Sequence, residues 1–141
     1  GETPTVSHTE RPRRGAVTVA GVVMILYLVS GRGGSLLARR YVRDVGKALA
    51  VAGRLESAGL RPNVARSGPK YVVYIATADL LKLAEKDDAV RRAIALYLAE
   101  EAKNGTPRQR EIAEKILQRH SFLSSQLPHH LLRHRQCLNR Y

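Results

Sequence analysis

The sequence predicts an α+β fold in which a small antiparallel sheet packs against helices. Two segments are rich in β-branched residues, three others repeat apolar residues at three- and four-residue spacing, and turn-forming residues separate them. With 141 residues, 44% of them hydrophobic, the chain is long enough to bury one core without disulfides. We therefore expect one domain over residues 15–120, a flexible basic arm at residues 1–14 and a basic tail rich in His and Arg at residues 121–141.

Residues 16–30, AVTVAGVVMILYLVS, form the most apolar run of the chain. With Gly15 and Gly31 the run spans 17 residues, fewer than the roughly 20 that a membrane-spanning helix needs. Its many β-branched residues and the central Gly21 favour strand over helix. We expect one long bent strand, or two short strands joined near Gly21, at the centre of the sheet. A membrane helix is the alternative interpretation.

Residues 35–59 have the pattern of an amphipathic helix. Ser35 is suited to cap its start, Gly59 ends it, and apolar residues recur between them at Leu37, Tyr41, Val45, Leu49, Ala52 and Leu55. The opposite face is basic, with Arg39, Arg40, Arg43, Lys47 and Arg54. Solvated helix faces usually pair acidic with basic residues, and acidic ones are scarce here. This face is therefore either simply solvated or in contact with phosphates.

Residues 60–77 predict a β-hairpin. The segments Leu60–Arg66 and Lys70–Thr77 flank the turn Ser67-Gly68-Pro69. Pro62 places the first segment at an edge of the sheet or at the start of its strand, because proline cannot donate to the ladder. Alternation directs Arg61, Asn63 and Ala65 to one face. Such a ribbon fits the major groove of DNA, where Arg can read guanine and Asn can read adenine.

Residues 78–105 predict a helix with a break near Asp87 and Asp88. Its apolar residues form one stripe, and Asn104-Gly105 stops it. Thr106 and Pro107 have the pattern of an N-cap and a first helical residue, so a further helix begins there. Residues 71–118 carry eight basic and eight acidic residues, and we expect this balanced region to be scaffold.

The charge of the chain is uneven. The formal net charge is +12, from 24 Lys and Arg against 12 Asp and Glu. Residues 30–70 hold nine basic residues and two acidic ones, and residues 119–141 hold four basic residues and no acidic one. A basic half beside a balanced half predicts an anionic partner. Nucleic acid is the partner we expect, and an acidic protein or a membrane surface is the alternative.

The residues that could carry other chemistry are few. The single Cys137 cannot form an internal disulfide, which favours a reducing compartment, and we expect a cytoplasmic protein. His130, His134 and Cys137 would share one face of a helix and could bind zinc, but a solvated basic tail explains them more simply. No nucleophile motif is present. We therefore expect no catalytic residue, no metal site and no cofactor.

The order strand, helix, two strands, helix, helix resembles the second half of a LAGLIDADG homing endonuclease domain. The closest stretch is YVVYIATADLL, residues 71–81, which enters the long helix, and the resemblance covers roughly Val17 to His120. It implies a sheet that forms half of a saddle, with its concave face on DNA. It also implies that Arg61, Asn63, Arg66 and Lys70 face the DNA.

The sequence departs from that family at its signature, a helix that ends in a metal-binding acidic residue. The run nearest in texture, Val19 to Gly34, contains no Asp or Glu. Cleavage of a phosphodiester with Mg²⁺ needs carboxylates to hold the metal. We therefore expect a DNA-binding relative without a complete catalytic site of its own, and Mg²⁺ would be its cofactor only if it cuts DNA.

The sequence thus predicts binding of nucleic acid, with duplex DNA as the expected form. Phosphate contacts would come from Arg39, Arg40, Arg43 and Lys47, and base-edge contacts from Arg61, Asn63, Arg66 and Lys70. A structural protein of a ribosome or virion, with basic tails threaded along nucleic acid, is one alternative. An active LAGLIDADG-type endonuclease is another. An open sheet edge would also allow a homodimer.

Overall fold

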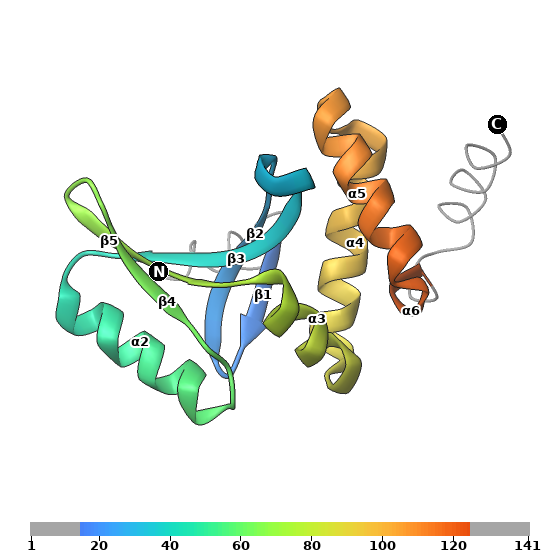
Figure 1. Cartoon of the computed structure of the whole chain (residues 1–141). Helices are drawn as coiled ribbons and strands as arrows, with labels where there is room; N and C mark the ends of the chain where they lie inside the picture. Colours follow the sequence, from blue (N-terminus) through green and yellow to red (C-terminus); the bar gives the residue numbers. More distant parts are fainter. Residues whose placement is uncertain (1–14, 125–141) are drawn as a thin grey trace, which may run out of the picture.

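The computed structural model describes residues 15–124 and confirms the α+β class. Five antiparallel strands form one sheet in the order β1-β2-β3-β5-β4, and the helices follow mainly in the second half of the chain (Figure 1). The elements are β1 (Ala16–Val19), β2 (Val22–Val29), the 3-10 turn η1 (Gly31–Gly33), β3 (Ser35–Val42), α2 (Val45–Ser57), β4 (Asn63–Ser67), β5 (Lys70–Ile75), α3 (Thr77–Lys86), α4 (Asp88–Asn104), α5 (Pro107–Arg119) and α6 (Ser121–Ser124).

The apolar run at residues 16–30 forms two strands, β1 and β2, joined by a tight turn. Ala20 and Gly21 make this turn with φ angles of 53° and 80°, as the prediction of two strands joined near Gly21 requires. The predicted central position is wrong, because β1 lies at one edge and β3 holds the centre. Within residues 15–124, no helix has the length and apolar character needed to span a membrane.

The predicted helix at residues 35–59 is wrong over its first third. Ser35–Val42 is a strand that pairs with β2 on one side and β5 on the other, and the helix begins only at Val45. Leu36 and Ala38 are fully buried and alternate with the half-buried Ser35, Leu37 and Arg39. Two flanking strands supply the backbone hydrogen bonds of this segment, and this tertiary pairing overrides its helical spacing.

The hairpin and the later helices agree with their predictions. β4 and β5 pair around a turn at Gly68, and β4 is an edge strand just after Pro62. Asp87 breaks the long helix into α3 and α4 and caps α4, since its carboxylate accepts from the amides of Ala89 and Val90 at 2.9 and 3.2 Å. Thr106 caps α5 with Pro107 in its first turn.

The packed region extends slightly beyond the predicted domain end at residue 120. α6 contacts α4 and α5, and Leu123 is fully buried in the core. The predicted arm at residues 1–14 and the tail from residue 125 onward lie outside the described residues. His130, His134 and Cys137 lie there as well.

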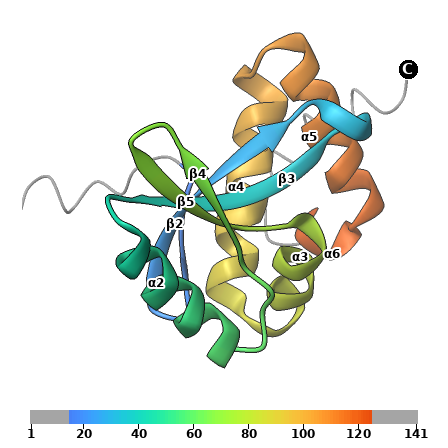
Figure 2. The same ribbon diagram turned by 60° about the vertical axis from the view of Figure 1, so that its left-hand side comes forward.

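The described helices cover one face of the sheet. α2 contacts β5, β3 and β4, α3 contacts β3, and α4 contacts β1, while α5 packs against α4 (Figures 1 and 2). The strand residues of the core all lie on the side of these helices: Val17, Val19, Val22, Met24, Leu26, Leu36, Ala38, Val73 and Ile75. We call this side of the sheet the helix-covered face.

Candidate nucleic-acid interface

The other side of the sheet, which we call the open face, is uncovered by any element within residues 15–124. Residues that oppose each other across an antiparallel pair share a face, so the strand registers assign its members. None of them is buried, whereas the buried strand residues all lie on the helix-covered face. The open face includes Ala16, Thr18, Val23, Ile25, Tyr27, Leu37, Arg39, Tyr41, Asn63, Ala65, Lys70, Val72 and Tyr74.

A cationic aromatic cluster occupies the middle of the open face. The guanidinium carbon of Arg39 lies 3.8 Å from the ring centre of Tyr27 and 5.2 Å from that of Tyr41. Tyr74 of β5 stands directly opposite Arg39 in the strand pairing. We call Tyr27, Arg39, Tyr41 and Tyr74 the tyrosine–arginine cluster. Its members come from three adjacent strands, and an arginine over an aromatic ring is attracted by the ring quadrupole.

The electrostatics of Tyr27 reflect this setting. Burial raises the pKa of its hydroxyl above the usual 10.0, and the nearby Arg39 opposes that rise. The neutral phenol is therefore favoured under ordinary conditions, and the positive charge of Arg39 is not cancelled by the tyrosine. Within residues 15–124, no carboxylate forms a salt bridge with Arg39.

The structure places three of the predicted site residues on the open face. Arg39 lies at its centre, Asn63 stands opposite Tyr74 on the edge strand β4, and Lys70 begins β5. Arg39 and Asn63 thus flank Tyr74 on its two sides. These three predicted residues, although distant in sequence, share one surface.

Two further predicted residues lie on the other side of the sheet. Arg40 follows Arg39 along β3 and therefore points away from it, and its Nη1 donates to the carbonyl of Val23 at 3.0 Å. Arg66 opposes Tyr71 and lies with its guanidinium carbon 5.9 Å from that ring centre. The family resemblance implies that Arg66 faces the DNA together with Asn63 and Lys70, but Arg66 lies on the opposite side of the sheet from them.

Arg43, Lys47 and Arg61 lie outside the strands. Arg43 and Lys47 are exposed around the start of α2, where Asp44 caps the helix by accepting from the Lys47 amide at 2.8 Å. Arg61 precedes β4, and its amide donates to the buried Asp79 at 2.7 Å while its guanidinium lies 3.5 Å from the same carboxylate. Arg61 thus ties the loop before β4 to α3.

The net positive charge of the described residues is concentrated in the sheet and α2. Residues 15–76, which contain the sheet and α2, hold nine basic and two acidic residues, and no open-face position is acidic. Residues 77–124 hold nine basic and eight acidic residues. Favourable potential for an anion is therefore expected over the sheet and the start of α2 rather than over α3–α5.

Sequence reasoning missed the three tyrosines of the cluster. Interpreting Ser35–Val42 as a helix put Tyr41 on the buried stripe and separated it from Tyr27 and Tyr74. Leu36 and Leu37 are adjacent apolar residues, so the segment lacks the alternation of apolar and polar residues that would have identified the strand.

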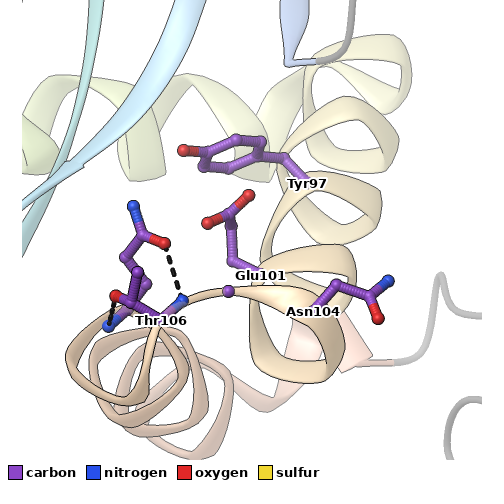
Figure 3. A pocket seen from close by; sticks show the side chains of 6 residues that line it. Tyr97, Glu101, Asn104 and Thr106 are labelled. Carbon is purple, nitrogen blue, oxygen red and sulfur yellow. Dashed lines mark hydrogen bonds between the residues drawn. The ribbon is translucent and has the colours of Figure 1, made fainter.

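A pocket of about 330 Å³ lies between the end of α4 and the start of α5 (Figure 3). Tyr97, Glu101, Asn104, Gly105, Thr106 and Gln109 line it. The amide of Thr106 donates to Gln109 Oε1 at 2.9 Å, and the amide of Gln109 donates to Thr106 Oγ1 at 3.2 Å. These groups form the capping box of α5. In the described part of the chain, no three His, Cys, Asp or Glu residues are grouped so as to hold a metal ion.

No protein-family model matches the chain, and no match is found among the curated proteins or the solved structures. Function is therefore inferred from the residues of the open face and their surroundings.

Proposed function

We propose that this protein binds nucleic acid through the open face of its sheet and the basic residues around the start of α2. One observation carries the proposal. The face left uncovered by the described helices has an arginine held at its centre, a lysine at its rim and no acidic residue. Such a surface attracts a polyanion, and the phosphates of nucleic acid supply regularly spaced negative charge.

The basic residues and Asn63 have different expected roles. Lys70, Arg43 and Lys47 are exposed, and we assign them to phosphates, which fix position without reading sequence. Asn63 is exposed beside the tyrosine–arginine cluster and can donate to and accept from a base edge. Duplex DNA and single strands both satisfy this proposal, because both present phosphates.

A distant relationship to LAGLIDADG domains is part of the proposal. The element order that suggested it is not observed, because three strands precede α2. Its support is the uncovered sheet face, since DNA lies on the sheet in that family. The segment nearest in texture to the signature helix instead forms β2 and η1, and it carries no carboxylate. The proposal therefore concerns binding, and assigns no catalytic residue.

The test compares matched charge removals in the full chain. Fluorescence anisotropy would measure binding to labelled duplex DNA, single-stranded DNA and RNA over a range of salt concentrations. Each lost phosphate contact should lower the slope of log K against log salt by about 0.7 to 0.9. Lys70→Gln should show this change, whereas Lys103→Gln, an exposed lysine at the end of α4, should not.

Absence of binding to all three nucleic acids at low salt would refute the proposal. A different result would favour the nucleoprotein alternative. If Lys70→Gln has no effect, while replacement of the tail residues Arg133, Arg135 and Arg140 by Gln abolishes binding, the basic tail rather than the sheet holds the nucleic acid.

A further inference from the structure

We infer that the open face recognises unpaired nucleotides, whose bases stack on the tyrosine–arginine cluster. The inference rests on the proposed function and narrows it from nucleic acid in general to single strands. Its physical basis is the aromatic content of the face rather than its charge. The chain has one Phe, no Trp and six Tyr, and three of those tyrosines gather on the open face.

The geometry of the cluster resembles a platform. Strands in a sheet lie about 4.8 Å apart, so side chains on β2, β3 and β5 form neighbouring rows on one surface. Tyr41 is 45% exposed and Tyr74 is partly exposed. Contact of an aromatic ring with water does not stabilise the fold, so exposed rings that lie close together indicate a binding surface. Two rings are thus available at the surface. They lie on the adjacent strands β3 and β5 and are offset by two residues along the strands.

Arg39 adds a third stacking surface. Its guanidinium already lies 3.8 Å from the ring centre of Tyr27, which is stacking distance, so Tyr27 orients it before any ligand arrives. A guanidinium held in this way can stack on a base and donate to a phosphate at the same time. Tyr27 is therefore a positioning residue, which holds Arg39 in place.

The chemistry of the cluster favours unpaired bases over duplex. Every base has a π-face, but the faces in a duplex are covered by the bases above and below. Only a single strand can offer them to tyrosine and arginine. Proteins that bind single strands combine such aromatic platforms with basic residues that contact the backbone, and Lys70 is placed at the rim for that role.

An acidic protein is a weaker match to this surface. Carboxylates would satisfy Arg39 and Lys70, but they would leave the two exposed tyrosine rings without a stacking partner. The rings and the cations together fit a ligand that alternates flat faces with negative charge.

The experiment separates stacking from charge. A labelled oligothymidylate of about 15 nucleotides and a labelled mixed-sequence duplex would be titrated with the full chain and its variants. Tyr41→Leu and Tyr74→Leu remove a ring but keep an apolar side chain. Each should weaken binding of the single strand about 5- to 150-fold, which corresponds to about 1–3 kcal/mol per stacked base. Tyr41→Phe and Tyr74→Phe keep the ring and should bind nearly as the parent does.

Circular dichroism would confirm that each variant is folded, and the exposure of Tyr41 makes it the safer position. Crosslinking of an oligonucleotide that contains 5-iodouridine gives a second readout. Irradiation should join it to the peptide that carries Tyr41 or Tyr74, as detected by mass spectrometry.

Several outcomes would overturn the inference. Equal or tighter binding of the duplex would do so, as would Leu variants that bind the single strand like the parent. Full competition by polyglutamate at equal charge would show that the face reads charge alone. Failure of the underlying function looks different, because then neither oligonucleotide binds and Lys70→Gln changes nothing.

Discussion

Gly34, which directly precedes β3, makes a close contact with α5 that can be tested by a single methyl group. Its φ of 98° and ψ of 135° are strained for any residue with a side chain. A Cβ at this position would lie 2.6 Å from Cγ1 and 3.0 Å from Cγ2 of Ile112. Ile112 is 2% exposed and branched at Cβ, so it cannot swing aside. Gly34→Ala therefore perturbs both the backbone and the contact between the sheet and the helices.

The expected cost has two parts. The backbone conformation should cost about 1–3 kcal/mol. Overpacking against Ile112 should add about 1–3 kcal/mol. Together, Gly34→Ala should lower the free energy of unfolding by about 2–6 kcal/mol, a large fraction of the roughly 5–15 kcal/mol of an ordinary domain.

The neighbouring glycines provide matched controls. Gly33 has a φ of 80°, but a Cβ there would meet no atom within 4 Å, so Gly33→Ala should cost only about 1–2 kcal/mol. Gly31 has neither a positive φ nor a close neighbour, and Gly31→Ala should be neutral or slightly stabilising. Urea denaturation followed by circular dichroism would measure all three.

A double-mutant cycle tests the contact itself. Ile112→Ala alone should cost about 2–5 kcal/mol. It also removes the carbons that clash with the methyl group introduced by Gly34→Ala, so the two changes together should cost about 1–3 kcal/mol less than their sum. Strict additivity, or equal effects of Gly34→Ala and Gly33→Ala, would refute the contact between the start of β3 and α5.

Two further predictions concern other contacts of the sheet. Thr77 Oγ1 donates to the carbonyl of Leu36 at 2.6 Å and accepts from its amide at 3.1 Å. Thr77→Val removes both hydrogen bonds and should lower the free energy of unfolding, measured by urea denaturation, by about 1–3 kcal/mol. Thr77→Ser retains both hydrogen bonds and should lower it less. Burial raises the pKa of Tyr27 above 10.0, so above pH 10 the folded state keeps a proton that the unfolded chain releases. The stability that the neutral Tyr27 contributes is fully present below pH 10. It is lost as the pH rises through the raised pKa of the folded state. Tyr27→Phe should show a smaller loss of stability above about pH 10 in parallel denaturation curves, and an unchanged loss would contradict the raised pKa.

Local signals in the sequence predicted the elements whose boundaries are set by their own residues. Gly21 in a β-branched run indicated a bend or turn, which is the β1–β2 turn, and Asp87 indicated a helix break, where its side chain caps α4. Thr106 indicated a helix start that its side chain caps. In each case a side chain or a glycine acts on backbone within a few residues. Such interactions are present in the sequence window itself, so they can be predicted without tertiary structure.

Residues 35–42 show where this reasoning fails. Leu37, Tyr41 and Val45 have the four-residue spacing of a helix, whereas Leu36 and Ala38 have the two-residue spacing of a strand face. A short segment can satisfy both periods. The choice is made by β2 and β5, whose pairing with β3 no local pattern encodes. One residue of register then decides whether Arg39 or Arg40 reaches the open face.

By itself, the sequence determined the α+β class, the β4–β5 hairpin, the Thr106 cap of α5 and the concentration of positive charge in residues 15–76, whereas Ser35, expected to cap a helix, begins β3. Only the tertiary structure decided that β3 is a central strand and that Tyr27, Arg39, Tyr41 and Tyr74 share one uncovered surface. The reason is physical. Caps, turns and net charge depend on neighbours along the chain, whereas a surface built across three strands depends on pairings between segments that are distant in sequence.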